Sequence, residues 1–224
     1  VMSFAPIGVF CLIGKFVIAD GLDIFQDVLA YVVLLISLLI FHALFTYSIF
    51  LKFIGGLSPI TFFKKIKNVA LFAFSTSSSA ATIPVTLKTV NQDLGVNQNV
   101  ASFVVPVGAT INMDGTAIMQ GLATVFIAQM SGIDLTLFQY GQVVLLAVAT
   151  SIGTAAVPSA GTITLIIILQ QFNLPLEAIG IILAVDRVLD MIRTSVNVTG
   201  DAAIACIVAK SENQLDETIF NSRQ

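Results

Sequence analysis

The feature that most constrains the fold is a row of polar and ionisable residues inside an otherwise apolar stretch long enough to cross a membrane. The row consists of Asp186, Asp190, Arg193, Asn197 and Asp201. On a helix these positions fall within about 80° of one another, on one narrow face. Each charged side chain near the bilayer centre costs on the order of 2.5–3.5 kcal/mol, so this face cannot point at lipid. We expect it to border a polar site inside the protein.

A structural alternative remains open for this row, because the acids and the arginine could form ion pairs between helices without binding anything. Pairing alone would not require the amide, hydroxyl and glycine residues that are interleaved with the charges, such as Asn197, Thr199 and Gly200. This mixture favours a binding site over a ladder of ion pairs.

The composition agrees with a membrane setting. Of the 224 residues, 57% are hydrophobic and 10% are charged, which is typical of an all-α polytopic membrane protein. The net charge of −3 offers no basic surface for nucleic acid. Cys11 and Cys206 have no pairing or metal motif, so we expect them to be packing residues. The chain opens inside an apolar stretch, and we expect it to be the C-terminal part of a longer membrane protein.

Apolar runs and their interruptions divide the chain. Residues 1–18 and 28–54 predict membrane-spanning helices, with an external loop up to residue 27. Residues 58–92 and 135–172 are interrupted near the middle by small, hydroxylated or proline residues, and each predicts a re-entrant hairpin, because a broken backbone at membrane depth must be buried or line a cavity. Broken helices over 98–131 and 176–210, with breaks at 108–116 and 193–201, are predicted to follow the hairpins, and 211–224 is a tail.

Lysines set the expected orientation. Lys52, Lys64, Lys65 and Lys67 surround the entry to the first hairpin, whereas the connections at 19–27 and 131–136 carry acids and no lysine or arginine. By the positive-inside rule the first connection is cytoplasmic, the other two are external, and the C-terminus is cytoplasmic. The two hairpins then enter from opposite faces, which predicts an inverted repeat with a site near the midplane. A pore with two re-entrant loops is an alternative that the row of charges disfavours.

Polar residues at both predicted breaks favour a cation site. The segments 112–116 and 197–201 each combine an amide, a carboxylate and a hydroxyl with a glycine. Unwound carbonyls and a carboxylate together supply the oxygen ligands that a hard cation such as Na⁺ prefers. The alternative to a cation site is an ordinary kink of the helix at each glycine. Arg193 could hold a carboxylate in a bidentate pair and Asp190 an ammonium group, which favours a zwitterion with an extra acid as the ligand.

The chain contains one histidine, His42, on the helix predicted over 28–54. No acidic residue within that segment could pair with it. We therefore interpret His42 as a packing residue rather than as a proton relay.

Four motifs make the sequence recognisable: SSSAATIP, PVGATINMDGTA, SIGTAAVPSAG and LDMIRTSVNVTGDA. In this order and spacing they closely resemble the sodium-coupled glutamate/aspartate transporter family, the dicarboxylate/amino acid:cation symporters, from the fifth transmembrane helix onward. The resemblance implies Na⁺-coupled symport of acidic amino acids by an elevator-like movement of a transport domain, residues 28–210. It also implies a homotrimer in the cell membrane, with residues 1–27 in the scaffold. The expected partners are an acidic amino acid, Na⁺ and the lipid bilayer.

The resemblance also assigns site residues by position. It puts the substrate α-carboxylate on Ser79 and Asn197 beside Ser78, the amino group on Asp190, the side-chain carboxylate on Arg193 and Thr116 next to Thr194, and closing contacts on Val157 and Gly161. One Na⁺ would take carbonyls of Gly108, Asn112 and Asn197 with the Asp201 carboxylate. A second would take Thr110, Ser151, Ile152 and Thr154, with the Met113 sulfur nearby. A third would use Asn112 and Asp114 with groups from a helix outside this sequence.

Three positions depart from the family pattern. The second arginine that family members usually carry would stand at position 77 or 191, which here are Ser77 and Met191. Arg187 lies about 120° around the helix from Arg193 and is a poor substitute. Gln120 stands where proton-coupled relatives have a carboxylate, so we expect transport without obligatory proton co-transport or potassium counter-transport.

Other functions stay open as alternatives. Within the same family, the chain could carry neutral amino acids (Ser, Thr or Ala) or C4-dicarboxylates, although Arg193 argues against a neutral carrier. From another class, it could be an intramembrane aspartyl protease using Asp114 and Asp201. In a protease dyad two carboxylates share one proton, and a nearby cation would instead keep both ionised. The presence of Arg193 and Asp190 therefore fits that chemistry poorly. We expect that the protein is not an enzyme.

Overall fold

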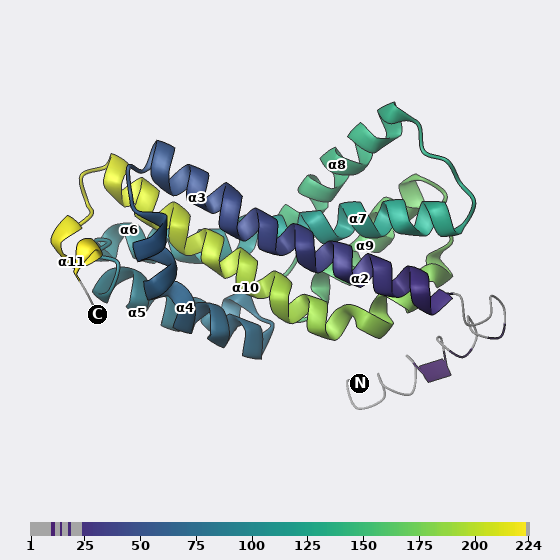
Figure 1. Ribbon diagram of the computed structural model, residues 1–224, viewed down its shortest axis with the longest axis horizontal. Helices are drawn as coiled ribbons and strands as arrows, with labels where there is room; N and C mark the ends of the chain where they lie inside the picture. Colours follow the sequence, from purple (N-terminus) through teal and green to yellow (C-terminus); the bar gives the residue numbers. More distant parts are fainter. Residues whose placement is uncertain (1–9, 12–13, 15–17, 19–23, 223–224) are drawn as a thin grey trace.

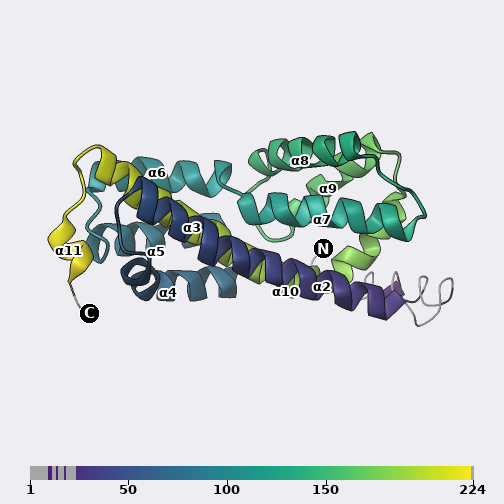
Figure 2. The same cartoon turned by 45° about the horizontal axis from the view of Figure 1, so that its top comes forward.

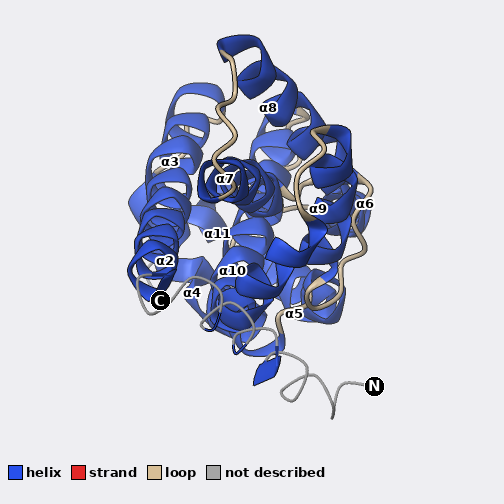
Figure 3. Ribbon diagram, turned by 90° about the vertical axis from the view of Figure 1, so that its right-hand side faces the viewer, coloured by secondary structure: helices blue, strands red, loops and turns tan. Residues whose placement is uncertain are grey.

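The computed structural model describes residues 10–11, 14, 18 and 24–222. Within this part the chain is helical, with no β-strand and one isolated bridge between Val96 and Leu215 (Figure 3). The helix predicted over 1–18 and the loop that follows it lie almost entirely outside the described residues. A first long helix covers residues 24–54. The elements that follow it are α4 (Pro59–Thr76), α5 (Ser79–Gln92), α6 (Gln98–Ile111), α7 (Asp114–Met130), α8 (Leu137–Ile152), α9 (Ala160–Gln171), η4 (Leu176–Ala178), α10 (Ile179–Ser211) and α11 (Glu217–Asn221).

The first long helix is continuous and contains two π turns. It runs through α2 (Ile24–Phe41), the π turn η2 (His42–Thr46), α3 (Tyr47–Ile49) and a second π turn, η3 (Phe50–Ile54). Its stretch Phe25–Ile54 is long and apolar enough to cross a membrane, and its most apolar 18-residue window has a mean hydropathy of 2.7. Large apolar side chains such as Leu29, Phe45 and Phe53 are exposed along it. An exposed apolar surface of this extent is expected to face lipid or another protein segment.

The remaining helices form two groups along the first long helix and α10. Helices α4, α5, α6 and α11 gather at one end, and α7, α8 and α9 gather at the other, while the first long helix and α10 run along the length between them (Figures 1 and 2). We call α4–α5 hairpin one and α8–α9 hairpin two, because in each pair the two helices pack against each other across a short connection. The two hairpins therefore approach the middle of the molecule from opposite ends.

The structure corrects our prediction for helix α10. We predicted a break at 193–201, but the α-helix is continuous from Ile179 to Ser211, and at 33 residues it is about 50 Å long. Gly200 does not interrupt it. A Cβ at this glycine would lie 2.6 Å from both the Asn112 side-chain nitrogen and the Tyr47 hydroxyl, so the glycine permits close packing rather than unwinding.

Local signals account for the other helix boundaries. Ser58 caps α4 ahead of Pro59, and Thr136 and Gln139 form a capping box at the start of α8. Helix α6 ends at Ile111 and α7 begins at Asp114, so the break predicted within 108–116 is a two-residue interruption at 112–113. Helix pairs joined at such polar breaks leave backbone groups free for other partners.

The C-terminal segment is fastened to hairpin one. The buried Lys65 ammonium donates to the carbonyl oxygens of Asp93 and Ile219, at 2.9 and 2.6 Å, and to the Ser222 hydroxyl at 3.2 Å. Phe220 is fully buried beside it. Three oxygen acceptors satisfy the three N–H donors of this lysine, which is why a cation can be buried here without a carboxylate.

Candidate functional site

The tips of the two hairpins meet at a small polar cavity. The Ser78 hydroxyl caps α5 by accepting from the Ala81 N–H, and it donates to the Ala156 carbonyl of hairpin two at 2.9 Å. The Ala80 N–H donates to the same carbonyl at 3.3 Å. The volume of the cavity is about 20 Å³, which is enough for about one water molecule. Its lining residues are Ser77, Ser79, Met113, Thr116, Thr154, Ala155, Ala156, Val157, Gly161, Asp190, Thr194 and Asn197.

Both tips contain a serine in a strained backbone conformation. Ser77 has φ of 51° and Ser159 has φ of 59°, in the left-handed region that residues other than glycine rarely adopt. Each such residue costs about 1–2 kcal/mol. The cost is tolerated where surrounding contacts hold the conformation, and such residues concentrate at functional sites.

The charged row on α10 lies directly against hairpin two. The Arg193 guanidinium donates from Nη2 to Asp190 Oδ1 at 2.5 Å and to Asp186 Oδ1 at 3.4 Å. Hairpin two contributes the Ser159 N–H, 2.9 Å from Asp190 Oδ2, and the Thr162 hydroxyl, 2.8 Å from Asp186 Oδ1. Arg193 is 1% exposed, so its guanidinium is a buried cation between two carboxylates.

The pairing in this row is incomplete. Among the described residues, Arg193 Nη1 and Asp186 Oδ2 are buried without a hydrogen-bond partner. An unpaired buried N–H of a guanidinium is costly, and it remains available to a further carboxylate oxygen. The ion pairs of this row therefore lie within α10 rather than between helices, and the arginine retains a donor beyond them.

The structure brings most of the predicted substrate contacts together. Ser79, Thr116, Val157, Gly161, Asp190, Thr194 and Asn197 line the cavity. Ser78 caps α5 and joins the tips instead, and Arg193 lies behind the lining. Asn197 links α10 to the start of α7, because its side chain accepts from the Gly115 N–H at 2.8 Å and donates to Thr116 at 3.3 Å.

The residues predicted for the first cation also converge. The Asn112 amide nitrogen lies 3.0 Å from Asp201 Oδ1 and 3.3 Å from the Asn197 carbonyl. A Cβ at Gly108 would lie 2.6 Å from Asp201 Oδ1, so only glycine lets this carboxylate approach α6. Asp201 is 2% exposed. A buried carboxylate next to the free end of α6 suits a cation ligand.

The residues predicted for the second cation are spread over two helix ends. Ser151, Ile152 and Thr154 lie at the end of α8 and just beyond it, whereas Thr110 lies near the end of α6 and donates to its own helix at Val107. No hydrogen bond between the described residues links Thr110 to α8. Met113 and Thr154 both border the cavity, with the Met113 sulfur 3.9 Å from the Thr116 hydroxyl.

His42, interpreted as a packing residue because its own segment holds no acid, has an acidic partner on another helix. His42 Nε2 lies 2.6 Å from Asp114 Oδ2, and the Tyr47 hydroxyl donates to the same oxygen at 2.5 Å. The acid comes from α7, 72 residues further along the chain, so inspection of the histidine's own segment could not find it. Asp114, which we assigned to a third cation, thus has two hydrogen-bond partners on the first long helix.

Gln120 forms hydrogen bonds with hairpin two that the sequence did not reveal. Its amide nitrogen donates to the Gly161 carbonyl at 3.0 Å and to the Thr164 hydroxyl at 2.8 Å. Its oxygen accepts from the Thr150 hydroxyl at 2.8 Å. The fully buried side chain thus ties α7 to both arms of hairpin two, using both the nitrogen donor and the oxygen acceptor of its amide.

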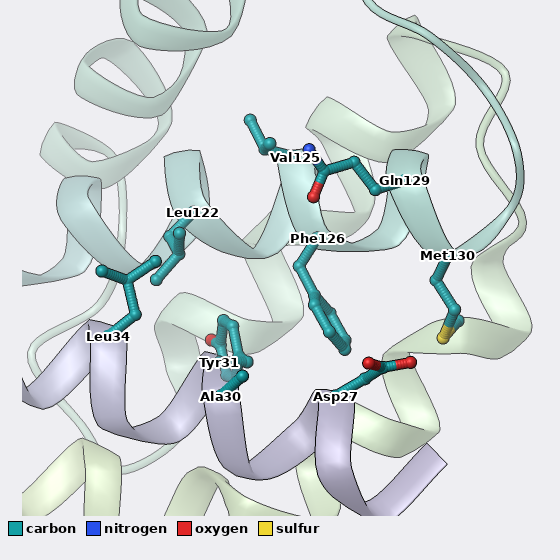
Figure 4. Close-up of a pocket in the computed structure, with 9 residues that line it drawn as sticks. All are labelled: Asp27, Ala30, Tyr31, Leu34, Leu122, Val125, Phe126, Gln129 and Met130. Carbon is teal, nitrogen blue, oxygen red and sulfur yellow. The ribbon is translucent and has the colours of Figure 1, made fainter. Parts of the chain in front are cut away.

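A larger groove lies on the outside, between α2 and α7, with a volume of about 480 Å³ (Figure 4). Tyr31 and Phe126 meet in it with ring centroids 5.1 Å apart. Asp27 and Gln129 are on its rim. Its position on the outside of these two helices separates it from the cavity between the hairpin tips.

Comparisons with known proteins agree with these observations. The family model described as "Sodium:dicarboxylate symporter family" matches residues 1–211. The chain is 42% identical over 210 residues to an excitatory amino acid transporter of Caenorhabditis elegans, 42% over 219 residues to excitatory amino acid transporter 2 of Homo sapiens and 40% over 224 residues to excitatory amino acid transporter 3 of Mus musculus. These alignments cover 93%, 96% and 99% of this chain and 42%, 38% and 43% of the relatives, so the chain spans about two fifths of their length. The chain belongs to the sodium:dicarboxylate symporter family.

Proposed function

We propose that this chain is the transport core of a Na⁺-coupled symporter for acidic amino acids. The observation that carries the proposal is the buried Arg193, which is shared between two aspartates directly behind the cavity and keeps its Nη1 amino group unpaired among the described residues. Buried arginines suit fixed, bidentate recognition of carboxylates. A neutral amino acid, the substrate in the alternative within the family, has no second carboxylate to pair with this donor once Ser79 and Asn197 hold its α-carboxylate.

The substrate would join the charged row at two points. Its ammonium group binds Asp190, whose Oδ2 now accepts from the Ser159 N–H, and its side-chain carboxylate binds Arg193 and Thr116. Its α-carboxylate takes the hydroxyl of Ser79 and the amide of Asn197, with Ser78, Thr194, Val157 and Gly161 around it. The support for this placement is that most of these residues line one cavity.

Substrate entry requires movement of the hairpin tips. A cavity that holds about one water molecule cannot take an amino acid. At the tips themselves, the hydrogen bonds that must open are those of Ala156 with Ser78 and Ala80 and that of Ser159 with Asp190. The bonds that Gln120 and Asp186 make to hairpin two lie on either side of its tip. Net contributions of about 0.5–1.5 kcal/mol each make such opening accessible. We propose that hairpin two is the gate and that the transport domain then moves as an elevator.

Sodium would couple to substrate through Asn197. The first Na⁺ takes the carbonyls of Gly108, Asn112 and Asn197 with Asp201, the second takes Thr110, Ser151, Ile152 and Thr154 near Met113, and the third takes Asn112 and Asp114. Asn197 contacts the Asp201 cluster through its backbone and the cavity through its side chain. Two ligands that stabilise one conformation of this residue must raise each other's affinity.

The proposed setting is a multi-pass protein of the cell membrane. Hairpins one and two enter it from opposite faces as an inverted repeat, the C-terminus is cytoplasmic, and a homotrimer forms. The meeting of the two hairpin tips from opposite ends of the molecule supports this arrangement (Figure 2). Membership of a symporter family points to transport rather than catalysis. The protease alternative has little support, because Asp114 and Asp201 share no hydrogen bond and each has other partners.

The decisive experiment is uptake of labelled aspartate, glutamate and serine by the full-length protein in vesicles, with and without a Na⁺ gradient. We expect Na⁺-driven uptake of the two acids. Arg193→Cys should weaken aspartate binding about 30- to several-thousand-fold, since losing one partner of a desolvated pair costs about 2–5 kcal/mol. Arg187→Cys is the matched control, because Arg187 lies on the same helix but is exposed. Uptake that is independent of Na⁺, or aspartate affinity that survives Arg193→Cys, would contradict the proposal.

A further inference from the structure

The π turn at His42–Thr46 decides which side chains of the first long helix face α7. In a regular α-helix, residues five positions apart lie about 140° apart around the axis. A π turn closes its hydrogen bonds after five residues and so brings such a pair onto one face. His42 begins this turn and Tyr47 follows it, and their rings meet edge to face with centroids 5.0 Å apart.

Both side chains converge on one oxygen. Asp114 Oδ2 lies 2.5 Å from the Tyr47 hydroxyl and 2.6 Å from His42 Nε2. The other carboxylate oxygen, Oδ1, accepts from the Gly115 N–H at 2.9 Å. The carboxylate is therefore held in one orientation at the first residue of α7, next to the break at 112–113.

Tyr47 also reaches the cluster around Asp201. Its hydroxyl lies 3.1 Å from the Val196 carbonyl of α10. A Cβ at Gly200 would meet this hydroxyl and the Asn112 amide nitrogen, each at 2.6 Å. Tyr47 is 3% exposed, so its hydroxyl is a buried group that connects α3 with Asp114 of α7 and with the Val196 carbonyl of α10.

We propose that Tyr47, with His42 beside it, is a positioning residue for a cation bound at Asp114, and that the π turn His42–Thr46 sets this geometry. The inference rests on the proposed function, which assigns Asp114 to a Na⁺ site. It deepens that assignment, because it names the side chains that orient the Asp114 carboxylate for the cation.

A positioning role differs from a merely structural one in what extra Na⁺ can restore. If Tyr47 orients Asp114 for a cation, removing its hydroxyl lowers Na⁺ affinity, and a higher Na⁺ concentration recovers full substrate binding. If Tyr47 only supports packing, the loss lowers the fraction of competent protein, which Na⁺ does not recover.

The test is equilibrium binding of labelled aspartate to the purified full-length protein across a Na⁺ titration. Tyr47→Phe should raise the half-saturating Na⁺ concentration about tenfold, while binding at saturating Na⁺ stays within about twofold of wild type. Tyr31→Phe is the matched control, because Tyr31 is equally buried on the same helix, yet its hydroxyl has no hydrogen-bond partner among the described residues. This control should titrate as wild type. If Tyr47→Phe does not fold, His42→Gln replaces it and should shift the Na⁺ titration in the same direction.

The outcomes separate this inference from the proposed function. A wild-type titration that does not depend on Na⁺, or an Asp114→Asn variant that titrates normally, overturns the assignment of the cation itself. A shift with Asp114→Asn but none with Tyr47→Phe overturns the positioning role alone. A smaller shift for Tyr47→Phe in the Asp114→Asn background than in wild type supports the role, because residues that act through one another are not additive.

Discussion

Adding one methyl group at Gly161 should disrupt the contact between hairpin two and α7. A Cβ at this glycine would lie 2.6 Å from Thr116 Cγ2 and 3.4 Å from Met119 Cε. Carbon atoms in contact prefer about 3.5–4.0 Å, so the start of α9 must move away from α7 by roughly 1 Å. That movement also lengthens the 3.0 Å hydrogen bond from Gln120 to the Gly161 carbonyl.

The expected cost follows from overpacking. Extra methyl groups in packed sites typically cost about 1–3 kcal/mol, so Gly161→Ala should lower the thermal unfolding midpoint and weaken aspartate binding about 5- to 150-fold. Both are measured on the full-length protein, by thermal unfolding and by equilibrium binding of labelled aspartate.

Gly141→Ala is the control within the same hairpin. Nothing lies within 4 Å of the position that its Cβ would occupy on α8. In open space, alanine favours a helix over glycine by about 0.5–1 kcal/mol, so this variant should be as stable as wild type or more so, with unchanged binding. If Gly161→Ala melts and binds like Gly141→Ala, the packing of α9 on α7 is not part of the substrate-bound conformation and the reasoning fails.

Three further substitutions test other parts of the structure. Asp201→Asn should weaken Na⁺ binding and, through it, aspartate binding, as read from substrate affinity across a Na⁺ titration; equal titrations of variant and wild type would contradict the assignment. Wild-type uptake at a fixed Na⁺ gradient and clamped voltage should not respond to an inward proton gradient or to internal potassium. Gln120→Glu should respond to protons, because a carboxyl group can donate toward hairpin two only when it is protonated. Lys65→Met should release residues 212–222, which limited proteolysis would detect as faster cleavage, whereas the exposed Lys64→Met should be cleaved as wild type.

Local sequence is sufficient to predict most helix boundaries. Serine, threonine and proline caps mark the starts of α4 and α8, and the runs of small polar residues mark the hairpin tips. These signals work because capping and turn formation depend on neighbouring residues only. The buried face of α10 is predictable for the same reason, since helix periodicity alone places Asp190, Arg193 and Asp201 together.

Glycine in α10 shows where local reasoning stops. The segment around Gly200 resembles the polar break at 112–116, yet α10 continues through it. A glycine weakens a helix by only about 1 kcal/mol, and packing along a buried helix easily outweighs that amount. Whether a glycine breaks a helix or admits a neighbour is therefore decided by what packs against it, here Tyr47 and Asn112.

The partner of His42 was decided by tertiary structure in the same way. The segment 28–54, which carries His42, has no acidic residue and so predicts a packing histidine. The π turn and the packing of α7 nevertheless bring Asp114 to it from 72 residues away. Helix ends and buried faces follow from interactions between neighbours in the chain, so the amino-acid order suffices for them. Which buried charge meets which depends on how whole helices pack, and that arrangement exists only once the chain is folded.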